Sequence, residues 1–237
     1  MTTREILTSV AYVVASFLFL LGLRGLTHPD TARRGTMFAA LGMLLGVLGT
    51  LVQAEIVRYE MIAIGLVVGT VIGIPMGLKI PMTKMPERIA LSHAFGGLAV
   101  ALVGVAHYWE SCSIGKPLDH FNMGATGFEV FMGAITFTGS LMAFGKLQEL
   151  LPGRPLTFPL QNVITIGSLG VVVVMVVILI FMPQLSWLFY VVVGLSFLLG
   201  ILLVLPIGGA DMPVVICLLN SYAGLAAAAS GFVFNNN

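Results

Sequence analysis

Eight continuous apolar runs, separated by short polar segments, constrain this 237-residue chain more than any other feature. Each run has 18 or more residues, enough for an α-helix to cross a hydrocarbon core about 30 Å thick. Only 9% of the residues are charged, whereas soluble domains carry about 25%. The sequence therefore predicts a membrane protein that crosses the bilayer many times.

The runs show no alternation of polar and apolar residues over segments of about ten residues, which is the pattern of a membrane β-barrel. They predict an all-α fold, a polytopic transmembrane helical bundle of about eight helices within a single domain over residues 1–237. The expected helices lie near residues 6–23, 37–54, 61–78, 89–106, 124–145, 163–182, 185–205 and 213–234.

Lysine and arginine in the short loops set the expected orientation, because cytoplasmic loops carry an excess of them. With the N-terminus outside, eight basic residues fall on the cytoplasmic side and three on the outer side. The eight are Arg24, Arg33, Arg34, Lys79, Lys84, Arg88, Lys146 and Arg154, and the three are Arg4, Arg58 and Lys116. The sequence predicts an external N-terminus.

Two crossings carry glycines at a spacing of four. The third has Gly65, Gly69, Gly73 and Gly77, and the second has "GMLLG" from Gly42 to Gly46. A helix face without side chains allows a neighbouring helix to approach closely in a membrane. Both patterns predict helix packing and indicate no chemistry.

Three polar residues are expected in one layer of the bundle: His93, Ser140 and Asn220. His93 lies seven residues past Pro86, Asn220 seven past Pro213, and Ser140 six before Lys146, which places each about 10 Å inside. Together an imidazole, a hydroxyl and an amide could hydrogen-bond one another or a short chain of water molecules. Histidine is the one that changes charge near neutral pH. The layer therefore predicts a proton path.

A purely structural role stays open for each of these residues. A neutral His93 could hydrogen-bond a neighbouring helix, Asn220 could join two helices through its amide, and Ser140 could bond its own backbone. A titratable ring in a membrane crossing is costly, which favours a functional His93. Glu129 lies near the outer end of its predicted crossing, and we expect it to be an interfacial carboxylate.

The loops on the predicted cytoplasmic face offer contacts for a partner domain. Asp211 lies in "LPIGGADMPV", where it could cap the last helix or contact a cytoplasmic partner. "MTKMPER" exposes Glu87 and Arg88 on the same face. No nucleotide-binding glycine motif is present, and no Cys or His pair has metal-ligand spacing. We therefore expect this chain to bind no cofactor and no metal by itself.

Three long segments resemble the membrane region of the beta subunit of proton-translocating NAD(P) transhydrogenase. They are "MTKMPERIALSHAFGGLAVALVG", "GAITFTGSLMAFGKLQ" and "PIGGADMPVVICLLNSYAGLAAAASGF". The resemblance runs in order along nearly the whole chain, and "IGGADMPVV" followed by "LNSY" is its most specific part.

The resemblance implies hydride transfer between NADH and NADP coupled to proton translocation, with NAD(H) and NADP(H) bound in soluble domains outside this chain. The implied hydride-transfer site is absent here, as are a ninth crossing and an NADP-binding domain that family members carry at the C-terminal side. The implied partners are the membrane helices of an alpha subunit and the soluble nucleotide-binding domains, in a dimeric assembly in a bacterial-type inner membrane.

The same resemblance implies roles for individual residues. His93 matches the histidine regarded as the protonatable gate, while Asn220 and Ser140 match polar positions of the same path. Asp211 matches an acid on the cytoplasmic face. Some family members place the histidine on another helix. Two alternatives stay open from the residues alone: a proton-coupled secondary transporter for a small solute, and a membrane anchor without chemistry.

Overall fold

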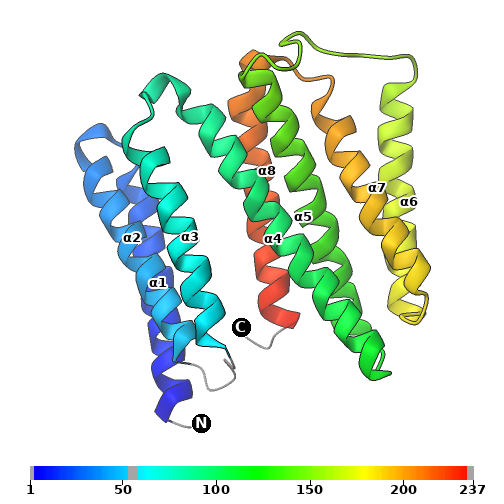
Figure 1. Ribbon diagram of the computed structural model, residues 1–237, viewed down its shortest axis with the longest axis horizontal. Coiled ribbons are helices and arrows are strands. Elements are labelled where there is room, and N and C mark those ends of the chain that lie inside the picture. Colours follow the sequence, from blue (N-terminus) through cyan, green and yellow to red (C-terminus); the bar gives the residue numbers. More distant parts are fainter. Residues whose placement is uncertain (1–2, 53–57, 234–237) are drawn as a thin grey trace. The chain divides into compact units, whose positions relative to one another are not determined.

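The part of the chain that the structure describes forms eight long helices (Figure 1). The computed structural model describes residues 3–52 and 58–233. In order, the elements are α1 (Thr3–Gly25), α2 (Pro29–Leu51), α3 (Tyr59–Leu78), η1 (Met82–Lys84), α4 (Met85–Ile114), α5 (His120–Leu147), α6 (Gln161–Phe181), α7 (Ser186–Val204), η2 (Gly209–Asp211) and α8 (Met212–Val233). Within the described residues there is no strand, and all eight α-helices are long and apolar enough to cross a membrane. The predicted all-α transmembrane class is confirmed.

The contacts group the chain into two units, Met1–Pro75 and Met76–Asn237. The sequence predicts one transmembrane domain over the whole chain, and this expectation stays a prediction. Two predicted helix ends, Ala54 and Phe234, lie outside the described residues.

In the first unit, α1 and α2 form an antiparallel pair in close backbone contact. A Cβ added at Gly42 would lie 3.0 Å from the carbonyl oxygen of Ala15. Gly35 and Gly49, seven residues to either side, are also buried against α1. The predicted packing role is therefore correct for Gly42, whereas a Cβ at Gly46 would meet no described atom within 4 Å.

Helix α3 belongs mostly to the first unit and carries the longer glycine pattern. A Cβ added at any of its four glycines would meet no described atom of that unit within 4 Å. None of its residues is buried. Within the described part of the first unit, the predicted close helix contact is not formed.

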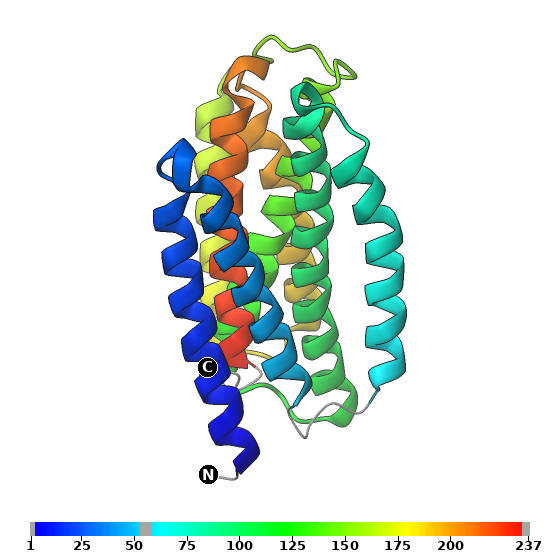
Figure 2. The ribbon, with the colours of Figure 1, turned by 90° about the vertical axis from the view of Figure 1, so that its left-hand side faces the viewer.

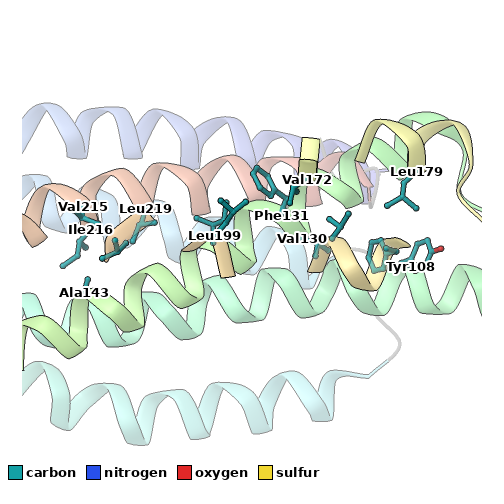
Figure 3. Packing of buried hydrophobic residues seen from close by; sticks show 14 of the residues in the cluster. Tyr108, Val130, Phe131, Ala143, Val172, Leu179, Leu199, Val215, Ile216 and Leu219 are labelled. Atoms are coloured by element: carbon teal, nitrogen blue, oxygen red, sulfur yellow. The ribbon is translucent and has the colours of Figure 1, made fainter. Parts of the chain in front are cut away.

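The second unit is built around α5, which packs against α4, α6, α7 and α8. Figures 1 and 2 show α5 inside this group of helices. Its interfaces contain the apolar core, in which Phe131 of α5 lies with Leu199 of α7 and Leu219 of α8 (Figure 3). Because α5 is covered on several sides, polar residues in its middle such as Thr136 and Ser140 are removed from both water and lipid.

Helix α4 extends eight residues beyond its predicted end at Ala106 and stops at Ile114. The segment between them contains neither proline nor glycine, so nothing in it breaks the helix. Gly115 ends α4 in the left-handed conformation, with φ of 71°, which glycine adopts without a steric penalty. The longer helix brings His107 inside the bundle, where the sequence did not predict a functional residue.

Candidate functional site

Helices α4 and α5 meet along a glycine-lined interface that fixes their antiparallel register. A Cβ at Gly97 would lie 2.9 Å from the backbone nitrogen of Phe137, and one at Gly133 would lie 2.8 Å from that of Ala101. The two backbones therefore touch with no side chain between them. The facing positions, in order, are Gly97 with Thr136, Ala101 with Gly133, and Gly104 with Val130.

This register places His93 and Ser140 on facing turns. His93 lies one turn before Gly97 on α4, and Ser140 lies one turn after Thr136 on α5. His93 is half-buried, and Ser140 is fully buried. The Nε2 atom of His93 and the Oγ atom of Ser140 are both buried without a hydrogen-bond partner among the described residues. Buried polar groups normally have partners, so this pair is a candidate site for proton binding.

Helix α8 reaches the same level of the bundle. The hydroxyl of Thr136 donates a hydrogen bond of 3.4 Å to the carbonyl oxygen of Leu219. Asn220 follows Leu219 and therefore lies at this level too, as expected from its depth. Its side chain, however, is on the exposed face of α8. The register places His93 and Ser140 at the same level of the α4–α5 interface, whereas the side chain of Asn220 is exposed.

Glu129 is fully buried on α5, with an exposed fraction of 0%. The expectation of an interfacial carboxylate is therefore wrong. The fifth helix begins at His120, four residues before its predicted start, so Glu129 is more than two turns inside it. Neither carboxylate oxygen has a hydrogen-bond partner among the described residues.

The spacing on α5 could have predicted from the sequence that Glu129 is buried. Thr126, Glu129, Thr136 and Ser140 fall at intervals of three, seven and four residues, which place them on one helix face. All four have an exposed fraction of 0%. We call these four residues the α5 polar stripe.

Helix α4 presents a matching row of residues to this stripe. His93, Gly97, Gly104 and His107 follow the same helical spacing. At the far end, Nδ1 of His107 forms a hydrogen bond of 3.3 Å with Oγ1 of Thr126. The row and the α5 polar stripe together form what we call the polar seam. His93 and His107 are 14 positions apart on α4, so the seam is about 21 Å long.

We call the end of the second unit where α4 begins the Met85 end, and the opposite end the Ile114 end. The loops that follow α5 and α7 lie at the Met85 end. At the Met85 end, the amide of Gln148 donates a hydrogen bond to the carboxylate of Glu87. Arg88 is half-buried, and its Nε atom has no partner among the described residues. Asp211 lies directly before α8 with an exposed side chain. The two roles considered for Asp211, capping α8 and contacting a cytoplasmic partner, both stay predictions.

Lys146 was not singled out from the sequence, yet it organises the Met85 end. Its side chain is 2% exposed, and its ammonium group donates to the carbonyl oxygens of Val204, Leu205 and Ile207. A cation suits the C-terminal end of a helix, here α7, because the helix dipole is negative there. The nearby loops are also joined by a backbone hydrogen bond of 2.7 Å from Gly209 to Gly153.

The described residues contain no group of three or more His, Cys, Asp or Glu side chains placed to hold a metal ion. The polar seam holds two separate imidazoles, those of His93 and His107, together with the carboxyl group of Glu129 and the hydroxyls of α5. Such a set can bind and pass protons. Fold and site together define a polytopic helical membrane protein with an internal row of protonatable groups.

Comparison with known proteins places the chain in a family. Residues 8–237 match the family model described as NAD(P) transhydrogenase beta subunit. The NAD(P) transhydrogenase subunit beta of Rhodospirillum rubrum is 39% identical over 234 residues, which are 97% of this chain and 50% of that protein. The sequence from its strain ATCC 11170 gives the same values. The chain belongs to the NAD(P) transhydrogenase beta subunit family, and it spans about half the length of these relatives.

Proposed function

We propose that this chain is the proton-conducting membrane part of an NAD(P) transhydrogenase. In the whole enzyme, hydride transfer between NADH and NADP is coupled to proton translocation across the membrane. The hydride-transfer site and the sites for NAD(H) and NADP(H) belong to soluble domains outside this chain. The chain contributes the path along which the proton moves.

Two buried polar atoms without hydrogen-bond partners among the described residues, Nε2 of His93 and Oγ of Ser140, are the observation that supports this proposal. Both present a buried polar atom without a partner to the same interface, and imidazole takes up and releases a proton near neutral pH. His93 binds a proton from one side of the membrane and releases it to the other. Ser140 hydrogen-bonds the ring or the passing proton carrier, and Asn220 serves the path from α8 when a partner covers its exposed face.

The distribution of charge supports an orientation for the second unit. Its Met85 end carries Lys79, Lys84, Arg88, Lys146 and Arg154, whereas the Ile114 end carries Lys116. Basic loops face the cytoplasm, so the Met85 end is cytoplasmic and the N-terminus is outside. Glu87, Arg88 and Asp211 then face the soluble NADP(H)-binding domain and couple its state to the membrane path.

The remaining partners follow from the same assignment. The membrane helices of an alpha subunit pack against this chain, and the assembly is a dimer in a bacterial-type inner membrane. The alternative of a secondary transporter requires a substrate site between broken helices. The helices of the second unit, α4 to α8, each run without interruption, so no observation favours that alternative.

Replacing His93 by alanine in the complete enzyme tests the proposal. The enzyme is reconstituted in liposomes, hydride transfer is started with NADPH and an NAD analogue, and internal acidification is followed with a pH-sensitive dye. We expect His93→Ala to slow proton translocation about a hundredfold, which is the usual size of a positioned acid–base group. Binding of NADPH, measured by calorimetry, stays unchanged.

His28→Ala is the matched control, because His28 is exposed before α2 and its side chain makes no capping hydrogen bond. This variant keeps full translocation. Undiminished proton translocation by His93→Ala would overturn the assignment of the gate. Uptake of a solute by liposomes that hold the chain without nucleotides would instead support a transporter.

A further inference from the structure

Glu129 stands apart from the other carboxylates of the chain because it is fully buried. Neither of its oxygens has a hydrogen-bond partner among the described residues. An ionised carboxylate in such surroundings costs several kcal/mol, on the order of a buried unpaired charge. The cost falls when the group takes up a proton or gains a partner. A buried carboxyl group without a hydrogen-bond partner is therefore suited to taking up and releasing a proton.

A glycine of α4 and a serine of α8 lie beside the carboxyl group of Glu129. A Cβ added at Gly104 of α4 would lie 3.3 Å from the carboxyl carbon of Glu129, so glycine leaves room beside the group. The hydroxyl of Ser230 on α8 lies near enough to interact with the carboxyl, although it does not form a hydrogen bond of standard geometry. Glu129 thus lies where α4, α5 and α8 meet.

One turn further toward the Ile114 end, a second titratable group lies on the same seam. His107 is hydrogen-bonded to Thr126, and Thr126 precedes Glu129 by three residues. Three residues of helix correspond to about 4.5 Å along the axis. From the Ile114 end inward, the imidazole of His107, the hydroxyl of Thr126 and the carboxyl group of Glu129 therefore follow one another along the seam.

We propose that Glu129 is a second proton-carrying residue, which exchanges protons between the Ile114 end of the seam and the His93–Ser140 pair. The inference rests on the proposed function. The inference assigns a proton-carrying group to the half of the proton path that lies away from His93. His107, Thr126 and Ser230 position the carboxyl group and connect it to the aqueous phase at that end.

The transfer involves protons alone. The carboxylate of Glu129 accepts one proton from a donor at one side and becomes a neutral carboxylic acid. It then gives that proton to an acceptor at the other side and returns to the carboxylate. Ser140 is eleven residues from Glu129 on α5, about 16 Å, so the step toward His93 passes Thr136 and requires bridging water molecules.

The test compares Glu129→Gln with Glu129→Asp in the complete enzyme. Glutamine keeps the size and hydrogen-bonding capacity of the side chain but cannot carry a proton. We expect Glu129→Gln to slow proton translocation about tenfold or more, and Glu129→Asp to recover part of the rate. Glu60→Gln, which changes an exposed carboxylate at the start of α3, is the control and keeps the full rate.

An infrared difference spectrum supplies a readout that a structural role would not produce. Reduction of bound NADP should change the carbonyl band of a protonated carboxylic acid, and this change should be missing in Glu129→Gln. Loss of the band together with slow translocation supports the proposal. Wild-type translocation in Glu129→Gln, or an unchanged band, overturns it.

The two proposals fail separately. If His93→Ala stops translocation while Glu129→Gln does not, only the role of Glu129 is wrong. If Glu129→Gln stops it while His93→Ala does not, the gate is misassigned, and Glu129 carries protons without passing them to His93. Normal size-exclusion profiles and thermal midpoints of both variants show that the loss is not a failure to fold.

Discussion

The ammonium group of Lys146 lies 2.6 Å from the carbonyl oxygen of Leu205, the residue that follows α7. Two further carbonyl groups, those of Val204 and Ile207, accept from the same ammonium. One side chain of α5 thereby holds the end of α7 and the start of the loop that leads to Asp211. Because Ser140 lies on the same helix as Lys146, this contact links the level of Ser140 to the Met85 end.

Lys146→Met should lower the stability of the second unit. The replacement keeps the length of the side chain but leaves three carbonyl groups without their charged donor, and a hydrogen bond to a charged group contributes about 1.5–3 kcal/mol. We expect a loss of about 2–3 kcal/mol, seen as a lower midpoint of thermal unfolding in detergent. Lys116→Met removes an exposed lysine and should leave the midpoint unchanged. Equal midpoints for both variants would show that the contact does not stabilise the fold.

Adjacent glycines on α4 give a second prediction. A Cβ at Gly97 would lie 2.8 Å from Cγ2 of Thr136, while one at Gly96 would meet no described atom within 4 Å. Gly97→Ala should therefore push α4 from α5 and cost about 1–3 kcal/mol. Gly96→Ala should be neutral or stabilising by up to about 1 kcal/mol, because alanine is the better helix former.

The pair of variants differs by one residue position, so composition and helix propensity are matched. Thermal unfolding of the purified protein in one detergent measures both. Proton translocation should fall in Gly97→Ala as well, because the same movement separates His93 from Ser140. A similar unfolding midpoint for the two variants would contradict the register of α4 and α5 derived from their contacts.

The level of His93 and Ser140 could be predicted from the sequence because depth depends only on counting residues from the helix ends. Counting residues does not show which side of each helix faces a neighbouring helix. Helices such as α8 are apolar on nearly all sides, so no polar face marks the outside. The exposure of Asn220 was therefore not predictable.

Glu129 was misplaced at the membrane interface, and His107 was missed, for a different reason. The expected end of the fourth helix, Ala106, and the expected start of the fifth, Gly124, were placed where hydropathy falls. In the structure, α4 continues to Ile114 and α5 already begins at His120. Polar residues inside a long helix lower the hydropathy without ending the helix. The structural stops, Gly115 and Pro117, were visible in the sequence and are the better guide to helix ends.

Disulfide cross-linking tests whether His93 and Ser140 face each other in the membrane. In a background with Cys112→Ser and Cys217→Ser, the double variant His93→Cys, Ser140→Cys should form a disulfide on mild oxidation. A disulfide requires Cβ atoms about 3.5–4.5 Å apart, which facing turns of two helices in backbone contact satisfy. Mass spectrometry of proteolytic peptides detects the linked pair.

Phe95→Cys with Ser140→Cys is the control for this cross-link. Phe95 lies two residues from His93, on the opposite face of α4, and is 59% exposed. Its cysteine should stay unlinked to the one at position 140, although the depth in the membrane is nearly the same. A disulfide from position 95 and none from position 93 would mean that α4 turns a different face toward α5. His93 would then lie outside the seam, and the gate would have to be sought on another residue.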